Sequence, residues 1–310
     1  MLKYIGKRFI SMMITIWVIV TLTFFLMHAI PGSPFNQERN TNDTVRKNLE
    51  AHYHLDENLF VQYGIYLKSL LQFDFGPSIK QSSTSVNELL SRGFPISFEL
   101  GSVALLFSII SGIALGIFAA LRHNGVIDYG AMTLAVIGIS VPNFIMATLL
   151  IQVVAVDLKL LPVATWASYK HMILPALALS MSPLAIIARL TRSSMLEVLT
   201  QDYIRTARAK GLSPFKIVVK HALRNALLPV ITILGTLVAA VLTGSFVIEK
   251  IFAIPGMGQY FVSSINDRDY PVIMGTTVFY STLLIFLLFL VDIAYGIIDP
   301  RIKLHKKEGE

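Results

Sequence analysis

Apolar residues in this chain form six long runs separated by polar connections, and the connection after the first run is much longer than the others. A helix needs about 20 predominantly apolar residues to cross the hydrocarbon core of a bilayer. The fourth run is short and holds Pro175 and Pro183, which neighbouring helices can accommodate in a membrane. The pattern predicts six transmembrane helices, at Phe9–Ile30, Leu100–Leu121, Ala131–Val156, Met172–Ala188, Ala226–Ile248 and Val272–Ile298.

The composition agrees with a membrane protein. Hydrophobic residues make up 54% of the chain, charged residues only 15%, and the mean hydropathy is +0.65, whereas about a quarter of the residues of a soluble domain are charged. The first apolar run is longer than the roughly 7–15 apolar residues of a signal peptide, so we expect an uncleaved anchor. The expected fold class is therefore an all-α integral membrane protein.

Lys and Arg predict the orientation of these helices. With both termini in the cytoplasm, sixteen of them lie on the cytoplasmic side and four in the short outer connections. Long loops are translocated largely regardless of charge, so the segment 31–99 does not count. The sequence predicts cytoplasmic termini, and this asymmetry accounts for the net charge of +7 without nucleic-acid binding.

The segment 31–99 is too long to be a simple connection. Within it, Phe60–Phe73 repeats apolar residues at helical spacing, which predicts an amphipathic helix. We therefore divide the chain into a cytoplasmic N-terminus with the first helix (1–30), an extracytoplasmic segment (31–99) and a five-helix core (100–310) that contains a polar cytoplasmic loop at 189–225.

Several kinds of chemistry find no support in the sequence. The chain has no cysteine, and it contains no GxxxxGK[ST], HExxH or GxSxG motif. His52 and His54 lie two residues apart without a carboxylate or cysteine at ligand spacing, so we predict a solvated loop there and no metal site. A membrane-embedded enzyme is disfavoured for the same reasons.

One charged stretch interrupts the apolar pattern: DYIRTARAKG, Asp202–Gly211. Gly211 suits the position after a helix, where a positive φ costs glycine nothing. Ser213 and Pro214 suit the N-cap and first turn of a second helix. The stretch therefore predicts a helix, a tight turn and a helix, with small side chains that another protein can approach closely. A generic basic loop is the alternative.

Five segments together resemble a known family. RTARAKG (Arg205–Gly211) and RNALLP (Arg224–Pro229) resemble the cytoplasmic coupling motif of ABC importer permeases, in the form of the oligopeptide and dipeptide permease family. ISVPNF, GSFVIEKIFAIPGMG and RDYPVIMG agree with it. The resemblance covers essentially the whole chain and is strongest to the first of the two permease subunits of such transporters.

The resemblance implies a type I ABC importer permease architecture that imports short peptides. The implied partners are a second permease subunit, two cytoplasmic ATPases, which would bind ATP and Mg²⁺, and an extracytoplasmic substrate-binding protein that meets the segment 31–99. No cofactor is expected in this chain. The residues implied in ATPase coupling are Tyr203, Arg205, Thr206, Ala207, Arg208, Ala209, Lys210 and Gly211.

The sequence departs from the general importer motif at one place. Arg205, Thr206 and Ala207 stand where the general motif has Glu-Ala-Ala, as in the peptide-permease variant. Relatives with the same motifs carry nickel, so a nickel cargo stays open, and a self-sufficient channel or secondary transporter is a less favoured alternative.

Polar residues in apolar runs are the candidates for the translocation path, because such residues are costly in lipid. They are Asn143, Gln152 and Asp292, and hydrogen bonding between helices is an equal alternative for Asn143. The Gly- and Pro-rich stretch before the sixth run predicts a tight loop with a re-entrant helix, a candidate outer gate, or else a surface turn. Its residues are Glu249, Pro255, Gly256 and Gly258. The spacing of Gly112 and Gly116 predicts close helix packing.

Overall fold

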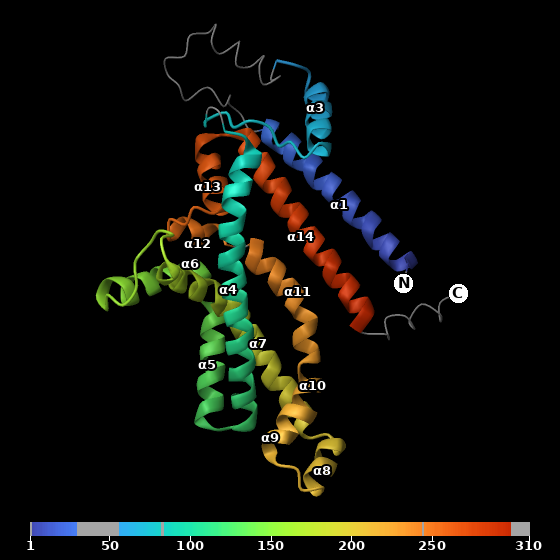
Figure 1. Ribbon diagram of the computed structural model, residues 1–310, viewed down its shortest axis with the longest axis vertical. Coiled ribbons are helices and arrows are strands. Elements are labelled where there is room, and N and C mark those ends of the chain that lie inside the picture. The colour runs from blue at the N-terminus through green and yellow to red at the C-terminus, as the bar shows by residue number, and fades with distance from the viewer. Residues whose placement is uncertain (1, 30–55, 82–83, 244, 299–310) are drawn as a thin grey trace. The chain divides into compact units, whose positions relative to one another are not determined.

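The computed structural model describes residues 2–29, 56–81, 84–243 and 245–298, and their regular elements are helices (Figure 1). The chain forms two compact units. One unit comprises residues 1–96 and 255–289, and the other comprises residues 97–254 and 290–310. His52 and His54 lie outside the described residues.

The first unit is built on two long apolar helices. They are α1 (Leu2–Ala29) and the part of α14 (Tyr270–Ile298) that ends at residue 289. Beside them lie α3 (Leu59–Leu71), the first turns of α4 (Val86–Leu121) and α13 (Met257–Asp267). The predicted amphipathic helix at Phe60–Phe73 is confirmed as α3. Its N-cap Asn58 accepts a hydrogen bond from the Phe60 N–H at 3.0 Å.

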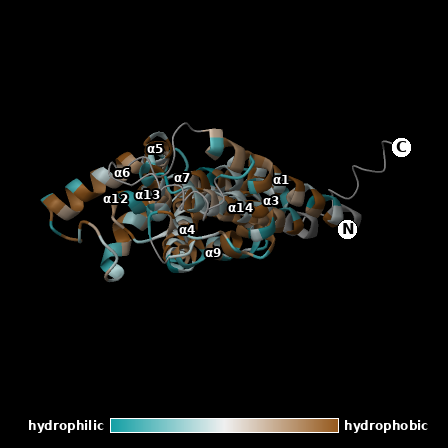
Figure 2. Ribbon diagram, turned by 90° about the horizontal axis from the view of Figure 1, so that it is seen from above, coloured by the Kyte–Doolittle hydropathy of each residue, from teal (hydrophilic) through white to brown (hydrophobic). Residues whose placement is uncertain are grey.

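The second unit holds the rest of α4 and the elements between it and residue 254. These are α5 (Val126–Ser140), α6 (Asn143–Leu150), the π-helix η1 (Ile151–Asp157), α7 (Tyr169–Leu199), α8 (Asp202–Ala209), α9 (Pro214–Lys216), the π-helix η2 (Ile217–Ala222), α10 (Leu223–Ala226), α11 (Leu228–Thr243) and α12 (Phe246–Ile251). Figure 2 shows that hydrophobic residues cover most of the long helices.

Among the described residues, five helical segments are long and apolar enough to cross a membrane. They are Ile5–Ala29, Val86–Leu121, Tyr169–Leu199, Leu228–Ile251 and Tyr270–Ile293. A sixth crossing exists if α5 and the α6–η1 segment count as one broken span. Six apolar segments were predicted, and five of them are single helical segments.

The predicted single span Ala131–Val156 is wrong. Helix α5 ends at Ser140, and the chain turns by 109° before it continues as α6 and η1. Pro142 explains the break, because a proline lacks the N–H that a helix needs and pushes the preceding residue into an extended conformation. Val141 accordingly has φ −89° and ψ 119°.

Two other helices are longer than predicted. Helix α4 begins at Val86, although residues 86–99 were assigned to the long polar segment, and α7 continues through residues 189–199, which were assigned to the polar loop. Both extensions hold charged residues such as Glu88 and Arg192. A hydropathy pattern stops at the first charges, whereas the backbone hydrogen bonds of a helix continue past them.

The predicted close packing at Gly112 and Gly116 is confirmed between α4 and α7. A Cβ atom on Gly112 would come within 2.9 Å of the Ile187 Cβ, and one on Gly116 within 2.5 Å of the Thr191 Cβ. Because real Cβ atoms essentially never approach so closely, only glycine allows the two backbones to pack at this distance.

Candidate functional site

Helix α8 has one apolar face that lies against its own chain. Ile204 and Ala207, three residues apart, are buried, and the other residues of Asp202–Ala209 are exposed. Residues three apart lie on the same side of a helix. Asp202 in the first turn and Arg208 in the last turn have the charges that suit the two ends of the helix dipole. The helix therefore presents a polar face away from the chain.

The turn after α8 is a Schellman motif. The Gly211 N–H donates to the Arg208 carbonyl at 2.9 Å, and the Leu212 N–H donates to the Ala207 carbonyl at 3.3 Å. This is the pattern of bonds that closes a helix through a left-handed residue. Gly211 has φ +75°, so the predicted left-handed glycine is confirmed.

The helix after the turn begins as predicted. Ser213 is the N-cap, its hydroxyl accepts a hydrogen bond from the Lys216 N–H at 3.4 Å, and Pro214 is the first helical residue. A side-chain bond ties the two helical segments together, because the Asn225 amide donates to the Tyr203 hydroxyl at 2.8 Å. The predicted helix, turn and helix are therefore all present.

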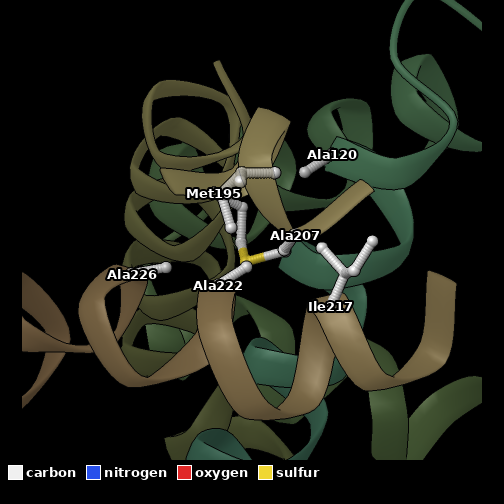
Figure 3. Packing of buried hydrophobic residues seen from close by; sticks show 7 residues of the cluster. Ala120, Met195, Ala207, Ile217, Ala222 and Ala226 are labelled. Carbon is white, nitrogen blue, oxygen red and sulfur yellow. The ribbon is translucent and has the colours of Figure 1, made fainter. Parts of the chain in front are cut away.

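A cluster of buried side chains holds α8 in place. We call it the α8 cluster, and its members are Ala120, Met195, Ile204, Ala207, Ile217, Ala222 and Ala226. Figure 3 shows the Met195 side chain reaching toward Ala207 and Ala222. Alanine in α4, α8, η2 and α10 lets these elements approach α7 closely, because small side chains allow neighbouring backbones to pack without a clash.

The cluster corrects one expectation for Ala207. Its small side chain was expected to lie against another protein, but it is only 5% exposed and packs inside this chain. The physical reason is that the two apolar residues of a short polar helix gain most from burial in the core of the chain itself. Ala207 therefore positions α8, and the surface open to a partner consists of the other residues of the helix.

The exposed face of α8 and its turn combines positive charge with small and aromatic groups. Its members are exposed in the structure: Tyr203, Arg205, Thr206, Arg208, Ala209, Lys210 and Gly211. Arg205 lies 3.5 Å from Asp202, and both side chains are largely solvated, so this ion pair contributes little to stability. The face is suited to a partner surface with negative charge.

Replacing Gly211 by valine is expected to weaken the turn and displace α8. A Cβ atom there would meet nothing within 4 Å, so the effect comes from the left-handed backbone alone, which costs a non-glycine residue roughly 1–2 kcal/mol. The measurement is the rate of proteolytic cleavage near residue 211 in the solubilised chain. Gly211→Asn is the control, because asparagine tolerates this conformation; equal cleavage of Gly211→Val and wild type would contradict the prediction.

The three candidate path residues lie on three different elements. Asn143 is the first residue of α6, directly after the break, and is half-buried. Gln152 lies in η1 and donates a hydrogen bond to the Asp157 carboxylate at 2.9 Å. Asp292 lies in α14 and is half-buried. The role of all three in a path stays a prediction.

The candidate gate residues lie on two short helices. Glu249 in α12 is fully buried, and its carboxylate accepts a hydrogen bond from the Ser245 hydroxyl. Gly256 is the N-cap of α13, Pro255 before it is exposed, and Gly258 is buried. Two short helices joined by a tight turn match the geometry expected of this stretch, and gating stays a prediction.

Sequence reasoning missed a buried ion pair in the second unit. Asp128, 1% exposed, accepts two hydrogen bonds from the Arg192 guanidinium, one from Nε and one from Nη2 at 2.8 Å. It also accepts the Asn124 N–H at 2.9 Å. The pair fixes the beginning of α5 to α7, because a bidentate Arg–carboxylate contact constrains both position and angle.

A second buried carboxylate was also missed, in the first unit. Asp269, 3% exposed, accepts hydrogen bonds from the Ser78 hydroxyl and from the N–H groups of Ile79 and Lys80, both at 3.2 Å. It lies directly before α14 and so ties the segment at 78–80 to the start of that helix. Its neighbours RDYP were noticed as a motif, but nothing in the sequence shows which distant backbone the carboxylate binds.

These features define a polytopic membrane protein that carries a rigid polar helix on a turn outside its apolar segments. Residues 112–304 match the family described as "Binding-protein-dependent transport system inner membrane component", and residues 1–101 match "Binding-prot-dependent transport system membrane comp, N-term". The chain belongs to this family of membrane transport components. The family is a component of transport systems rather than an enzyme, and the chain is a multi-pass membrane protein.

Several relatives match over almost the whole chain. The dipeptide transport system permease protein DppB of Bacillus subtilis is 72% identical over 99% of this chain and 100% of its own length. The oligopeptide transport system permease protein OppB of Haemophilus influenzae is 45% identical and that of Escherichia coli 44% identical, each over 98% of this chain and 100% of the relative.

Solved structures share the fold. One of them shows inward-facing conformations of the MetNI methionine ABC transporter, and the match has a TM-score of 0.55 and 22% identity and covers 68% of this chain and 94% of that one. An amino acid ABC transporter with histidines matches with a TM-score of 0.52 and 16% identity, over 68% and 95% of the two chains. The expected type I ABC importer permease fold is thereby confirmed.

Proposed function

We propose that this chain is a permease subunit of an ATP-driven importer of dipeptides and other short peptides. The observation that carries the proposal is the 72% identity to a dipeptide permease over 99% of this chain and the whole of that relative. In this role the chain forms half of the translocation path together with a second permease subunit. An extracytoplasmic binding protein delivers the peptide, and the segment 31–99 contributes to the surface that receives it.

In the proposed assembly, the exposed face of α8 docks on a cytoplasmic ATPase subunit that binds ATP and Mg²⁺. The termini and α8 lie on the cytoplasmic side, which the excess of Lys and Arg in those parts of the sequence supports. Three contacts support a mechanical role: the Schellman turn, the bond from Asn225 to Tyr203, and the α8 cluster. A helix held from three sides moves as one body with α7 and η2.

Movement of α8 would then change the packing of the membrane helices around the path. Rocking of rigid helical units about a central site is a known route to alternating access. Within this proposal Asn143, Gln152 and Asp292 contribute to the path, and the stretch with Glu249, Pro255, Gly256 and Gly258 gates its outer end. Polar side chains in apolar segments and tight turns beside them support these assignments.

Replacing Ala209 by tryptophan tests the docking of α8. Ala209 is exposed and its neighbour Ala207 is not, so the bulky ring leaves the chain itself intact but blocks close approach of a partner, as overpacking does in any contact. We expect the ATPase to be lost on co-purification and peptide uptake to fall to the level of cells that lack the chain. The measurements are ATPase co-purification and uptake of labelled di-, tri- and pentapeptides and nickel.

The control is Ala167→Trp, the same substitution at an exposed alanine before α7. It is expected to keep both the ATPase and uptake. If Ala209→Trp keeps both as well, α8 is not the docking element. If wild-type protein restores nickel uptake and no peptide uptake, the cargo assignment is wrong while the docking result stands by itself.

A further inference from the structure

The first compact unit contains two cavities that the proposed transport function does not use. Both lie between α1 and α14, and both are partly closed by α3 and the residues after it. They share one wall, because the Phe75 side chain lines each of them. We call the larger one the groove and the smaller one the cavity, and they differ in the chemistry of their walls.

The groove is apolar and has a volume of about 700 Å³. Met13, Trp17 and Val20 line it from α1, and Leu283 and Phe286 line it from α14. Among the described residues no charged side chain lines it, and Thr282 supplies the single hydroxyl group in its walls. Trp17 is 56% exposed and Phe286 46% exposed, so the groove opens toward the surroundings of the two membrane helices and accepts hydrocarbon.

The cavity continues along the same two helices and has a volume of about 300 Å³. Phe24 and His28 line it from α1, and Tyr270 and Met274 line it from α14. The groove is lined by residues 13–20 of α1 and 278–286 of α14, so the cavity lies nearer the end of α1 and the beginning of α14. The two helices run antiparallel, and one seam joins the groove to the cavity.

Polar groups are concentrated in the cavity. Gln62 and Ser69 of α3 and the carboxylate of Asp74 line it together with His28. The His28 Nε2 lies 3.1 Å from the Gln62 Oε1, which ties α3 to α1. Burial raises the pKa of the Tyr66 phenol, so this ring is a neutral wall. The seam is thus apolar over most of its length and polar at one end.

The length of the seam matches one leaflet of a bilayer. From Met13 to Phe24 the lining of α1 covers eleven residue steps, about 16 Å at about 1.5 Å per residue, against about 15 Å for half of the hydrocarbon core. His28 lies one turn farther, at the end of the apolar segment Ile5–Ala29. A transmembrane helix of a partner would need an apolar seam at both ends, whereas an amphiphile needs one polar end.

The charge of the cavity selects the headgroup. Asp74 accepts the Gly76 N–H with Oδ1 at 2.9 Å, and its Oδ2 has no hydrogen-bond partner among the residues that the structure describes. The rings of Phe24, Phe75 and Tyr270 line the same cavity, and in the described part of the chain no lysine or arginine does. A carboxylate beside aromatic faces attracts an ammonium group and repels a headgroup with net negative charge.

We propose that the groove and the cavity together bind one membrane phospholipid with a primary-amine headgroup. One acyl chain fills the groove between α1 and α14, and the ammonium group of the phosphoethanolamine type lies at Asp74. The lipid thereby fills the seam that joins the two membrane helices of this unit. This site is independent of the α8 face and of the proposed path.

Lipid retention by the full chain tests the site. The protein is reconstituted in nanodiscs with equal amounts of phosphatidylethanolamine and phosphatidylglycerol, extracted in mild detergent and measured by native mass spectrometry. We expect one phosphatidylethanolamine to remain bound to each chain. Thr282→Trp, which fills the groove, is expected to lose it. Leu288→Trp, on the same helix but outside the groove lining, is expected to keep it.

Asp74→Asn tests the headgroup without altering a buried position, because Asp74 is exposed. Loss of one charge-assisted contact is expected to reduce the preference for phosphatidylethanolamine over phosphatidylglycerol roughly tenfold. Equal retention of both lipids by wild type, or equal retention by the two tryptophan variants, would overturn the proposal. So would displacement of the lipid by a dipeptide, or a photo-crosslinker at Leu283 that captures a protein instead of lipid.

Discussion

Replacing Ala207 by tryptophan is expected to displace α8 even when no partner is present. Ala207 is buried in the α8 cluster beside Met195 and Ala222, and a ring in this space forces the packed helices apart. Overpacking of a core costs about 1–3 kcal/mol and sometimes more. The two side chains that hold α8 by its inner face would be lost together, so peptide uptake is expected to be abolished.

The measurement is limited proteolysis of the solubilised chain without its ATPase, followed at the α8 turn. Ala207→Trp is expected to be cleaved faster than wild type, whereas Ala209→Trp, two residues away and exposed, is expected to be cleaved at the wild-type rate. The pair separates positioning of α8 from docking on α8. If neither variant changes the cleavage rate, the α8 cluster does not hold the helix.

Replacing Asp128 by leucine is expected to be the most destabilising polar substitution in the second unit. It leaves the Arg192 guanidinium without its bidentate partner. Breaking a buried ion pair costs about 3–5 kcal/mol, and the lower end applies because Arg192 keeps 24% of its side chain exposed. The measurement is the midpoint of thermal unfolding in detergent, which is expected to fall.

The control for Asp128→Leu is the double variant Asp128→Leu with Arg192→Met. Apolar replacement of both partners of a buried pair is often neutral, so the double variant is expected to recover most of the lost stability. A double variant that is no more stable than Asp128→Leu would show that the carboxylate acts through the Asn124 N–H rather than through Arg192.

Local signals in the sequence predicted local structure well. The left-handed Gly211, the Ser213 N-cap and helix α3 were all predicted because their causes lie within a few residues of each other. Gly112 and Gly116 were recognised because close packing leaves a compositional trace. The family resemblance supplied the overall fold, which hydropathy alone reduces to a number of apolar runs.

Contacts between distant segments could not be predicted in the same way. Asp128 and Arg192 are 64 residues apart, and Asp269 and Ser78 are 191 apart. Nothing in either local sequence specifies the partner, because both carboxylates would be equally at home as ordinary helix-start residues. The inward orientation of Ala207 was missed for a related reason: a short polar helix has a buried face only in relation to neighbours that the pattern does not show.

The π-helix η2 also sets the rotation of α10 relative to α8. Ile217 and Ala222, five residues apart, both belong to the α8 cluster, although in an α-helix such residues are about 140° apart around the axis. A π-turn accommodates one residue more than an α-turn. Removing a single residue between 217 and 222 would therefore wind η2 into an ordinary α-helix and rotate α10 by about 100° relative to α8, so an indel there acts as a change of angle between the two helices.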